Sequence, residues 1–426
     1  MSGVNFLEKL LDGGEVEWRA LGTLCELVRG NGLQKKDFAE AGVPAIHYGQ
    51  IYTYYGLSTT KTKSFVSPEL ARQLKKVNKG DVVITNTSEN LEDVGKALAY
   101  LGEQQAVTGG HATILKPGEL MLGKYFAYFT QTDEFAAGKR KYAKGTKVID
   151  VSATDMAKIL IPIPCPDNPK KSLEIQAEIV RILDAVTELT AELTAELTAE
   201  LISRKKQYTH YRDQLLDFEG KEVDHLPLGD PAVGVFIRGG GLQKKDFTEL
   251  GMGCIHYGQI YTHYGTYAYK TKTYVSKEFF NKSRKAKPGD LVIATTSEND
   301  EDVCKAVAWL GSDEIAVSSD ACIFRHKLNP KYVSYFFQAE QFQKQKRQHI
   351  TGIKVRRVNA DDLAKILIPI PSLEEQARIV EILEKLDALT NFISEDLSRE
   401  IALRQKQYEY YRDLLLSFPK QEEVAA

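Results

Sequence analysis

The sequence predicts an α+β protein: two similar mixed-β domains separated by two long helices that pack antiparallel as a coiled coil. Three observations lead to this prediction. Most of the 426-residue chain is an internal duplication. A quartet, Thr-Ala-Glu-Leu, occurs three times over residues 190–201, in a stretch without glycine or proline. Short β-branched and aromatic runs between Gly, Asn and Ser clusters indicate strands in both copies.

The two domains are expected at residues 1–171 and 219–371. In each, the sequence predicts two central strands, a helix rich in aromatic residues, and a last β-branched strand that is closed by proline and leads into a long helix. The predicted elements are strands 82–85, 112–115 and 159–163 with helix 125–135, and strands 291–295, 321–324 and 366–370 with helix 332–342. The best-matched segments are 32–38 with 241–247, 46–52 with 255–261, 80–84 with 289–293, 87–90 with 296–299, and 157–164 with 364–371.

Residues 172–218 are expected to form the first long helix, because Ala, Glu and Leu are strong helix formers. From Ile175 to Leu193 the apolar residues follow alternating steps of four and three, which is typical of a coiled-coil seam. Through the quartets the step is a uniform four. The positions expected to pack here are Leu189, Leu193, Leu197 and Leu201.

The second long helix is expected in residues 372–426, with the same length as the first. At a constant offset of 200, the quartet leucines align with Leu389, Ile393, Leu397 and Ile401, so the apolar step is kept although the literal repeat is lost. One helix alone would leave its apolar stripe in water. Antiparallel pairing would bury both stripes and relate the two domains by a pseudo-twofold axis.

Composition describes an ordinary globular protein, with 43% hydrophobic and 27% charged residues. No run approaches eighteen apolar residues and the N-terminus shows no signal segment, so we expect a cytoplasmic protein without membrane contact. The five cysteines form no CxxC pair or metal-spaced cluster and are expected to be reduced thiols; no metal site is predicted. A net charge of −2 does not indicate a nucleic-acid partner, so any evidence for such a partner must come from the local distribution of charge.

Both copies carry a basic cluster around a glycine, which we interpret as a DNA-contacting loop. Basic side chains on such a loop can neutralise phosphates and reach base edges. The candidates are Lys139, Arg140, Lys141, Lys144 and Lys147 in the first copy, and Lys344, Lys346, Arg347, Lys354, Arg356 and Arg357 in the second. A solvated loop that only aids solubility is the alternative for a single cluster, and the presence of two matching clusters favours DNA.

Other shared polar residues give weaker signals. Two lysine pairs could touch phosphate or simply face solvent: Lys35 with Lys36, and Lys244 with Lys245. His47 with Tyr48, and their copies, could stack on bases or form a buried hydrogen-bonded pair. The segment 87–90 and its copy are expected to be structural turns.

No catalytic motif is recognisable. The chain has no GxxxxGK[ST] phosphate loop, and Asp167-Asn168-Pro169 only begins like the Asn-Pro-Pro-Tyr box of amino-methyltransferases. We therefore expect this chain to bind and position, while any chemistry takes place elsewhere.

On these residues the chain closely resembles the specificity subunit of Type I restriction-modification enzymes, over its whole length. The resemblance is carried by the duplicated unit with its Gly-Asp-Val-Val-Ile and Ile-Pro-Ile-Pro segments, the repeated helix starts, the Arg-Lys-Lys-Gln-Tyr and Tyr-Tyr-Arg-Asp-Leu helix ends, and above all the quartets. It implies that each globular unit is a target-recognition domain that reads one half of a bipartite DNA sequence. It also implies that the long helices dock two methyltransferase subunits.

The resemblance further implies that the partner subunits, and not this chain, hold the cofactors. S-adenosylmethionine would serve adenine-N6 methylation, and ATP with Mg would serve the restriction subunits in translocation and cleavage. The two recognition domains are unusually alike for this family, so we expect two similar half-sites and a nearly palindromic target. The quartets would set the spacer between the half-sites. Two alternatives are a self-sufficient methyltransferase or nuclease with an unrecognised site, and a coiled-coil protein scaffold.

Overall fold

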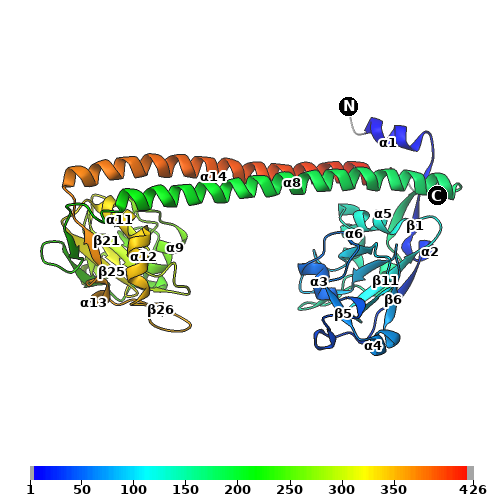
Figure 1. The fold of residues 1–426 in the computed structure, drawn as a ribbon, viewed down its shortest axis with the longest axis horizontal. Coiled ribbons are helices and arrows are strands. Elements are labelled where there is room, and N and C mark those ends of the chain that lie inside the picture. Colours follow the sequence, from blue (N-terminus) through cyan, green and yellow to red (C-terminus); the bar gives the residue numbers. More distant parts are fainter. Residues whose placement is uncertain (1–3, 420–426) are drawn as a thin grey trace. The chain divides into compact units, whose positions relative to one another are not determined.

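The computed structural model describes residues 4–419 and divides into two compact units (Figure 1). Among the described residues, the first unit contains residues 4–196 and 400–419, and the second contains residues 197–399. Each unit thus consists of one mixed-β domain with part of each long helix. The two long helices are α8 (Pro169–Leu216) and α14 (Leu373–Leu416).

The first domain has short strands and helices in the order α1 (Val4–Leu11), β1 (Val16–Ala20), α2 (Leu21–Leu24), β2 (Cys25–Arg29), η1 (Lys35–Asp37), β3 (Val43–Ile46), α3 (Tyr48–Thr53), β4 (Ser58–Thr59), β5 (Ser64–Val66), α4 (Pro68–Gln73), β6 (Lys75–Val77), β7 (Val82–Thr85), β8 (Thr87–Ser88), β9 (Ala97–Tyr100), β10 (Ala106–Thr108), β11 (Ala112–Pro117), α5 (Gly123–Phe129), α6 (Asp133–Tyr142), β12 (Ile149–Asp150), α7 (Ala153–Met156) and β13 (Leu160–Pro164). A five-stranded mixed sheet, in the order β2-β11-β7-β9-β4, lies beside a four-stranded one, in the order β5-β3-β10-β6. Two small pairs, β1-β13 and β12-β8, complete the domain.

The second domain repeats this topology. Its elements are β14 (His225–Pro227), β15 (Gly234–Arg238), η2 (Lys244–Asp246), β16 (Phe247–Thr248), β17 (Met252–Ile255), α9 (Tyr257–Thr262), β18 (Tyr267–Ala268), β19 (Thr273–Val275), α10 (Lys277–Lys282), β20 (Lys285–Ala286), β21 (Leu291–Ala294), β22 (Thr296–Ser297), β23 (Ala306–Trp309), β24 (Ile315–Val317), β25 (Ala321–His326), α11 (Pro330–Gln338), α12 (Glu340–Arg347), β26 (Arg356–Arg357), α13 (Ala360–Leu363) and β27 (Leu367–Pro369). Its sheets run β15-β25-β21-β23-β18 and β16-β19-β17-β24-β20, with the pairs β14-β27 and β22-β26. The predicted α+β class with two similar mixed-β domains is confirmed.

Each aromatic-rich helix is in fact two helices. The first splits into α5 and α6 because Thr132 caps a new helix: its hydroxyl accepts from the Phe135 amide. In the second domain the break falls between α11 and α12 at Ala339. The buried aromatic side chains on both sides of each break, such as Phe129 and Phe135, pack into one core.

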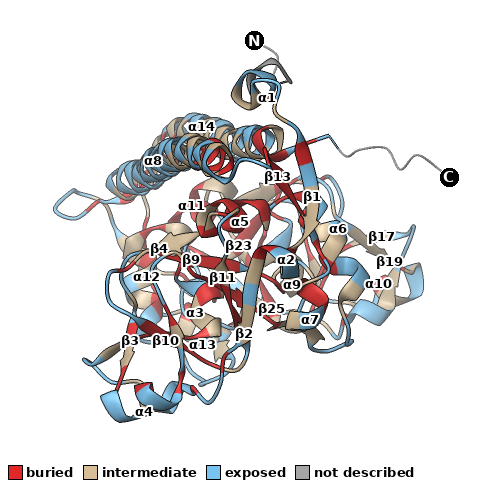
Figure 2. Ribbon diagram, turned by 90° about the vertical axis from the view of Figure 1, so that its right-hand side faces the viewer, coloured by how far each residue is buried: buried red, intermediate tan, exposed pale blue. Residues whose placement is uncertain are grey.

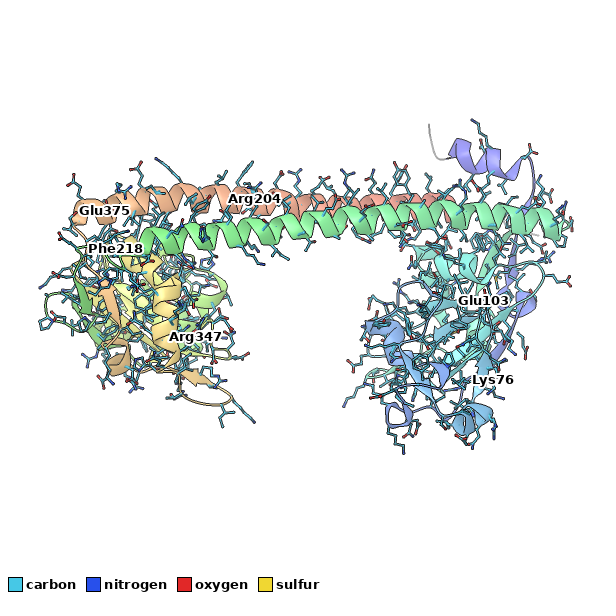
Figure 3. The ribbon with its side chains drawn as sticks, viewed as in Figure 1. Lys76, Glu103, Arg204, Phe218, Arg347 and Glu375 are labelled. Atoms are coloured by element: carbon cyan, nitrogen blue, oxygen red, sulfur yellow. The ribbon has the colours of Figure 1, made fainter. Side chains whose placement is uncertain are left out.

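The ends of the long helices belong to the domain cores, which fixes their direction within each unit. In the first unit, Ile179 and Leu183 near the start of α8 share a core with Leu416 at the end of α14. In the second unit, Phe218 just beyond α8 shares a core with Ile379 and Leu383 near the start of α14 (Figure 3). The start of one helix therefore meets the end of the other in both units, as expected for antiparallel helices.

The duplicated Gln-Ala segment has a structural purpose. Gln176 is fully buried: its Oε1 accepts from the Leu122 amide and its Nε2 donates to the Leu120 carbonyl, at 2.9 and 2.7 Å. Gln376 accepts from the Asn329 amide at 2.9 Å in the same way. One buried glutamine per domain thus joins a long helix to the loop before α5 or α11.

The two long helices are not equal in length, contrary to the prediction: α8 has 48 residues and α14 has 44. The extra turn begins at Pro169, where the Asn168 side chain accepts from the Lys171 amide and caps the helix. The Asn-Pro dipeptide is therefore a helix start and not part of a methyltransferase box. In α14, Ser372 caps the later start by accepting from the Glu375 amide.

The predicted packing positions divide into two groups. Leu189 and Leu389 are 55% and 56% exposed, so their assignment to the buried seam is wrong. Steps of four advance about 40° beyond a full turn each, so the row crosses the seam at an angle and its first members lie outside it. The other predicted positions are half-buried: Leu193, Leu197, Leu201, Ile393, Leu397 and Ile401. Figure 2 shows exposed and half-buried colours along most of both helices.

The second domain contains a half-buried histidine, His326, that has no counterpart in the first. His326 lies at the end of β25 with its ring 5.0 Å from that of Phe324, and burial lowers its pKa to about 4. Pro117 occupies the same place at the end of β11. In the unfolded chain the His326 imidazole binds a proton near pH 6.5, whereas in the folded chain it does so only near pH 4. The neutral ring therefore contributes no penalty above pH 6.5, and the free energy of unfolding decreases as the pH falls from 6.5 towards 4.

Acidification from pH 6.5 to 4 is therefore expected to destabilise the second domain by roughly 3 kcal/mol more than the first. Urea unfolding followed by the fluorescence of Trp309, after replacing Trp18 with Phe, reports on that domain, and the converse variant reports on the first. His326→Phe should remove the difference. Equal acid sensitivity of the two domains would contradict the assignment.

Candidate nucleic-acid interface

The predicted basic loops are only partly loops. Lys139, Arg140 and Lys141 lie in the last turn of α6, and Lys344, Lys346 and Arg347 lie in α12. After each helix the chain forms a tight hairpin. We call the one after α6 hairpin 144–150 and the one after α12 hairpin 351–357. Their ends are joined by backbone bridges between Lys144 and Asp150 and between Thr351 and Arg357.

Two of the candidates are buried. Lys139 is 6% exposed and Lys346 is 0% exposed, and burial lowers the pKa of both. The Lys139 ammonium donates to the carbonyls of Glu92 and Val94 at 2.7 Å, and that of Lys346 donates to two equivalent carbonyls at 3.0 Å. The prediction that these two lysines contact phosphate is wrong, because their donors are already used inside the protein.

The remaining helical cations are on the surface. Arg140, Lys141, Lys344 and Arg347 are exposed, and Arg347 is also paired with Glu340 at 3.0 Å (Figure 3). An exposed pair of this kind contributes little to stability, so Arg347 can exchange its partner for a phosphate.

Hairpin 144–150 presents a basic and apolar tip. Gly145 has φ +102°, and a Cβ there would collide with the Val148 carbonyl, so this tight turn needs glycine. Lys147 is exposed and Val148 is 58% exposed, whereas Lys144 is held 3.0 Å from Asp155. The far strand, β12, pairs with β8 and attaches the hairpin to the Thr87–Ser88 segment.

Hairpin 351–357 has the same design with a different side-chain set. Gly352 has φ +88° and is needed for the same reason as Gly145. Lys354 and Arg357 are exposed, and Ile353 is 92% exposed at the tip. Arg356 is held by Asp300 at 2.8 Å, so it is less available for DNA. Strand β26 pairs with β22, which is Thr296–Ser297.

An aromatic cluster lies next to hairpin 144–150. The rings of His47 and Tyr48 are 4.6 Å apart, Tyr48 lies 4.8 Å from His111, and the Tyr52 hydroxyl donates to the Thr87 carbonyl at 2.7 Å. The segment 87–90 was expected to be a turn, but it forms the short strand β8 (Thr87–Ser88) followed by a bend at residues 89–90, and it links this cluster to the hairpin. Lys35 lies at the edge of the same cleft, which has a volume of about 340 Å³.

His47 and Tyr48 were expected either to stack on bases or to form a buried hydrogen-bonded pair, and the structure gives each residue a different role. His47 is buried and caps α3: its Nδ1 accepts from the Gly49 amide at 3.1 Å. Burial and the neighbouring Lys35 lower its pKa, which keeps the ring neutral and able to accept. Tyr48 is half-buried and lines the cleft, so it is the member of the pair that a base can reach. His256 and Tyr257 repeat this arrangement at the start of α9.

The lysine pairs lie on one-turn helices, and Lys35 lines the cleft beside His47 and Tyr48. Lys35 and Lys36 are exposed in η1, and Lys244 and Lys245 are exposed in η2. Within residues 4–419, no carboxylate lies within 4 Å of their ammonium groups. Four exposed cations without a carboxylate partner are suited to phosphate contact.

Sequence reasoning missed His111, which lines the cleft beside Tyr48, and Asp320, which occupies the equivalent position in the second domain. A signal existed: both follow a glycine or serine pair and precede a matched strand, yet they differ in chemical type. In the part of the chain that is described, no group of three His, Cys, Asp or Glu side chains could hold a metal ion. The described helices include none long and apolar enough to cross a membrane.

The chain is similar to known proteins over most of its length. The model of the Type I restriction modification DNA specificity domain matches residues 14–202 and 242–403. The chain is 35% identical to the specificity subunit of the Type I restriction enzyme EcoR124I/EcoR124II of Escherichia coli, with 100% of both chains covered. It is 33% identical to a putative Type I restriction enzyme specificity subunit of Haemophilus influenzae, with 97% of this chain and 98% of the relative covered.

Solved structures share the fold. A chain from work on complex assembly and conformational transition of the type I R-M system aligns with a TM-score of 0.70 at 16% identity, covering 95% of this chain and 98% of that one. The HsdS subunit from Thermoanaerobacter tengcongensis aligns with a TM-score of 0.53 at 16% identity, covering 94% and 96%. The chain belongs to the family of Type I restriction-modification DNA specificity subunits, the non-catalytic components that recognise DNA sequence in restriction-modification complexes.

Proposed function

We propose that each of the two domains reads one half of a bipartite DNA target, and that the chain positions methyltransferase and restriction subunits on it. The observation that carries this proposal is that one exposed surface occurs twice: a basic hairpin, an aromatic helix start and an unpaired lysine pair in each domain. The domains proposed to act in this way are residues 1–171 and 219–371, joined by the helical segments 172–218 and 372–426.

The exposed cations are assigned to the DNA backbone. Lys35, Lys36, Arg140, Lys141 and Lys147 serve the first half-site, and Lys244, Lys245, Lys344, Arg347 and Lys354 serve the second. Phosphate contacts fix the register of the protein on the duplex, whereas groove contacts carry the sequence information. Arg357 is exposed on its hairpin and suits a bidentate contact to guanine.

The long helices are proposed to dock two methyltransferase subunits, one on each unit, and the restriction subunits are recruited to that complex. Large apolar side chains exposed on these helices support this role: Leu189, Ile202, Tyr211, Leu389, Phe392, Leu403, Tyr410 and Tyr411. S-adenosylmethionine, ATP and Mg are assigned to those partners, which methylate adenine at N6 or cleave unmodified DNA. The site of action is the cytoplasm, where the host DNA is accessible.

Because segments 32–38, 46–52 and 87–90 are repeated without change, the two half-sites are expected to be similar and the target nearly palindromic. Methylome sequencing of a host that carries the system tests this directly. Two unrelated half-sites would contradict it, and the absence of any bipartite methylated motif would contradict the proposed function.

Removing the hairpin lysines is expected to weaken binding to all sequences alike. Lys147→Ala combined with Lys354→Ala should lower the slope of log affinity against log salt by about 2, since each phosphate contact contributes nearly one. Fluorescence anisotropy with the methyltransferase complex measures this. Lys79→Ala, which removes an exposed lysine paired with Glu103, is the matched control and should leave the slope unchanged. An unaltered slope in the double variant would remove the hairpins from the interface.

A further inference from the structure

We infer that the two half-sites differ at one base pair, read by His111 with Asp150 in the first domain and by Asp320 with Arg357 in the second. These two couples occupy equivalent positions and have opposite polarity. The inference rests on the proposed function and deepens it, because it names the residues that distinguish the two domains.

In the first domain the couple lies on both sides of Thr87. The His111 Nδ1 is 3.3 Å from the Thr87 hydroxyl, and Asp150 is paired with Thr87 in the β12–β8 ladder. His111 is exposed and Asp150 is half-buried. With its Nδ1 directed at the hydroxyl, His111 has its Nε2 available to donate, whereas the Asp150 carboxylate can only accept.

In the second domain the same two positions are inverted. Arg357 is paired with Thr296, the counterpart of Thr87, and Asp320 follows the equivalent turn. Asp320 and Arg357 line one cleft of about 410 Å³. The Asp320 backbone carbonyl is fixed by the Thr295 amide and hydroxyl at 2.9 and 3.0 Å. Here the acceptor occupies the His111 position and the donor occupies the Asp150 position.

Several neighbours of the couple are the same in both domains. The capping histidine, the following tyrosine, the lysine pair and the threonine between the two members are all identical. Burial lowers the pKa of both His47 and His256; His111 adds to this lowering at His47, whereas Asp320 opposes it at His256, so the two residues act on equivalent neighbours with opposite sign. The couple therefore differs beside residues that the two domains share, whereas other neighbours differ as well, such as Asn86 against Thr295 and Gly110 against Ser319.

The side-chain donor and the side-chain acceptor have exchanged positions between the two domains. The base pair that they recognise must therefore present its acceptor and its donor in exchanged positions as well. Guanine presents N7 and O6 acceptors in the major groove, and cytosine presents the N4 amino donor. Arg357 with Asp320 suits a G·C pair in one orientation, and Asp150 with His111 suits the same pair reversed. The half-sites are thus expected to match except at this pair, which is inverted in one of them.

The test is to exchange the couples. His111→Asp combined with Asp150→Arg should convert the first half-site to the second at one base pair and make the methylated motif a perfect palindrome. Asp320→His combined with Arg357→Asp should do the reverse. With purified complex and two duplexes that differ only at this pair, preference should be reversed by about 10- to 100-fold. Methylome sequencing of hosts with each variant identifies the base pair.

The outcomes separate this inference from the proposed function. An unchanged motif in both exchanged variants would overturn the inference and leave the proposed function intact. Loss of all sequence preference, in variants whose melting temperature is unchanged, would also overturn it, because the exchange would then have abolished reading without redirecting it. If one exchanged variant fails to fold, the reciprocal exchange in the other domain tests the inference by the same criteria. A wild-type complex without a bipartite motif would overturn the proposed function itself.

Discussion

Deletion of the third quartet, residues 198–201, is expected to change the spacer of every methylated site by about one or two base pairs while leaving both half-sites unchanged. Four helical residues correspond to about 6 Å of rise and about 40° beyond a full turn. A base pair corresponds to about 3.4 Å along the duplex. The quartets lie within the single uninterrupted helix α8 that leads from the first domain to the second. A shorter helix therefore requires half-sites at a different spacing.

Controls separate helix length from side-chain chemistry. Glu200→Ala removes the ion pair with Arg204, 2.7 Å long, and keeps every residue of α8 in place, so the spacer should not move. Insertion of a fourth quartet should move it in the opposite direction from the deletion. Methylome sequencing measures the spacer for the wild-type chain, the deletion, the insertion and Glu200→Ala. An unchanged spacer after deletion and insertion would show that the quartets do not set the spacing.

The fold could be predicted well where the sequence pattern is local. The duplication defined both domains, and the strand at residues 82–85 was placed at its observed bounds. The break between α5 and α6 also had a local signal: Thr132 followed by two acidic residues is a typical helix start. The regular spacing of aromatic residues across the break still favoured a single helix, because the rings of both helices face one core.

The errors at the candidate site arose where burial depends on distant chain segments. Lys139 looks like any member of a basic cluster, and its burial follows from the turn at Glu92 and Val94, more than forty residues earlier. Leu189 fits the four-residue step, but the rotation of that step carries it to the solvent side. His111 joins the aromatic cluster only because the sheets bring the loop before β11 beside α3 and β8.

Placing charge on the outer face of α14 is expected to detach the methyltransferase from the second unit. Leu389 and Phe392 are 56% and 70% exposed, and Leu383 on another face of the same helix is buried in the domain core. Two apolar anchors at a protein interface contribute about 1.5–3 kcal/mol each. Leu389→Glu combined with Phe392→Glu should therefore lower the affinity for the purified methyltransferase at least about 100-fold. Titration calorimetry measures this loss.

The fold of the second unit should survive this change, because neither side chain is part of its core, so its melting temperature is the check that the effect is local. Ser398→Glu adds the same charge at an exposed position on a different face of α14 and should leave methyltransferase affinity unchanged. If a second copy of this chain covers the face instead, the wild-type chain alone will be dimeric and the double variant monomeric, with methyltransferase affinity unaltered. The apolar face has one occupant in either case, and sedimentation of the isolated chain before and after the substitution distinguishes the two.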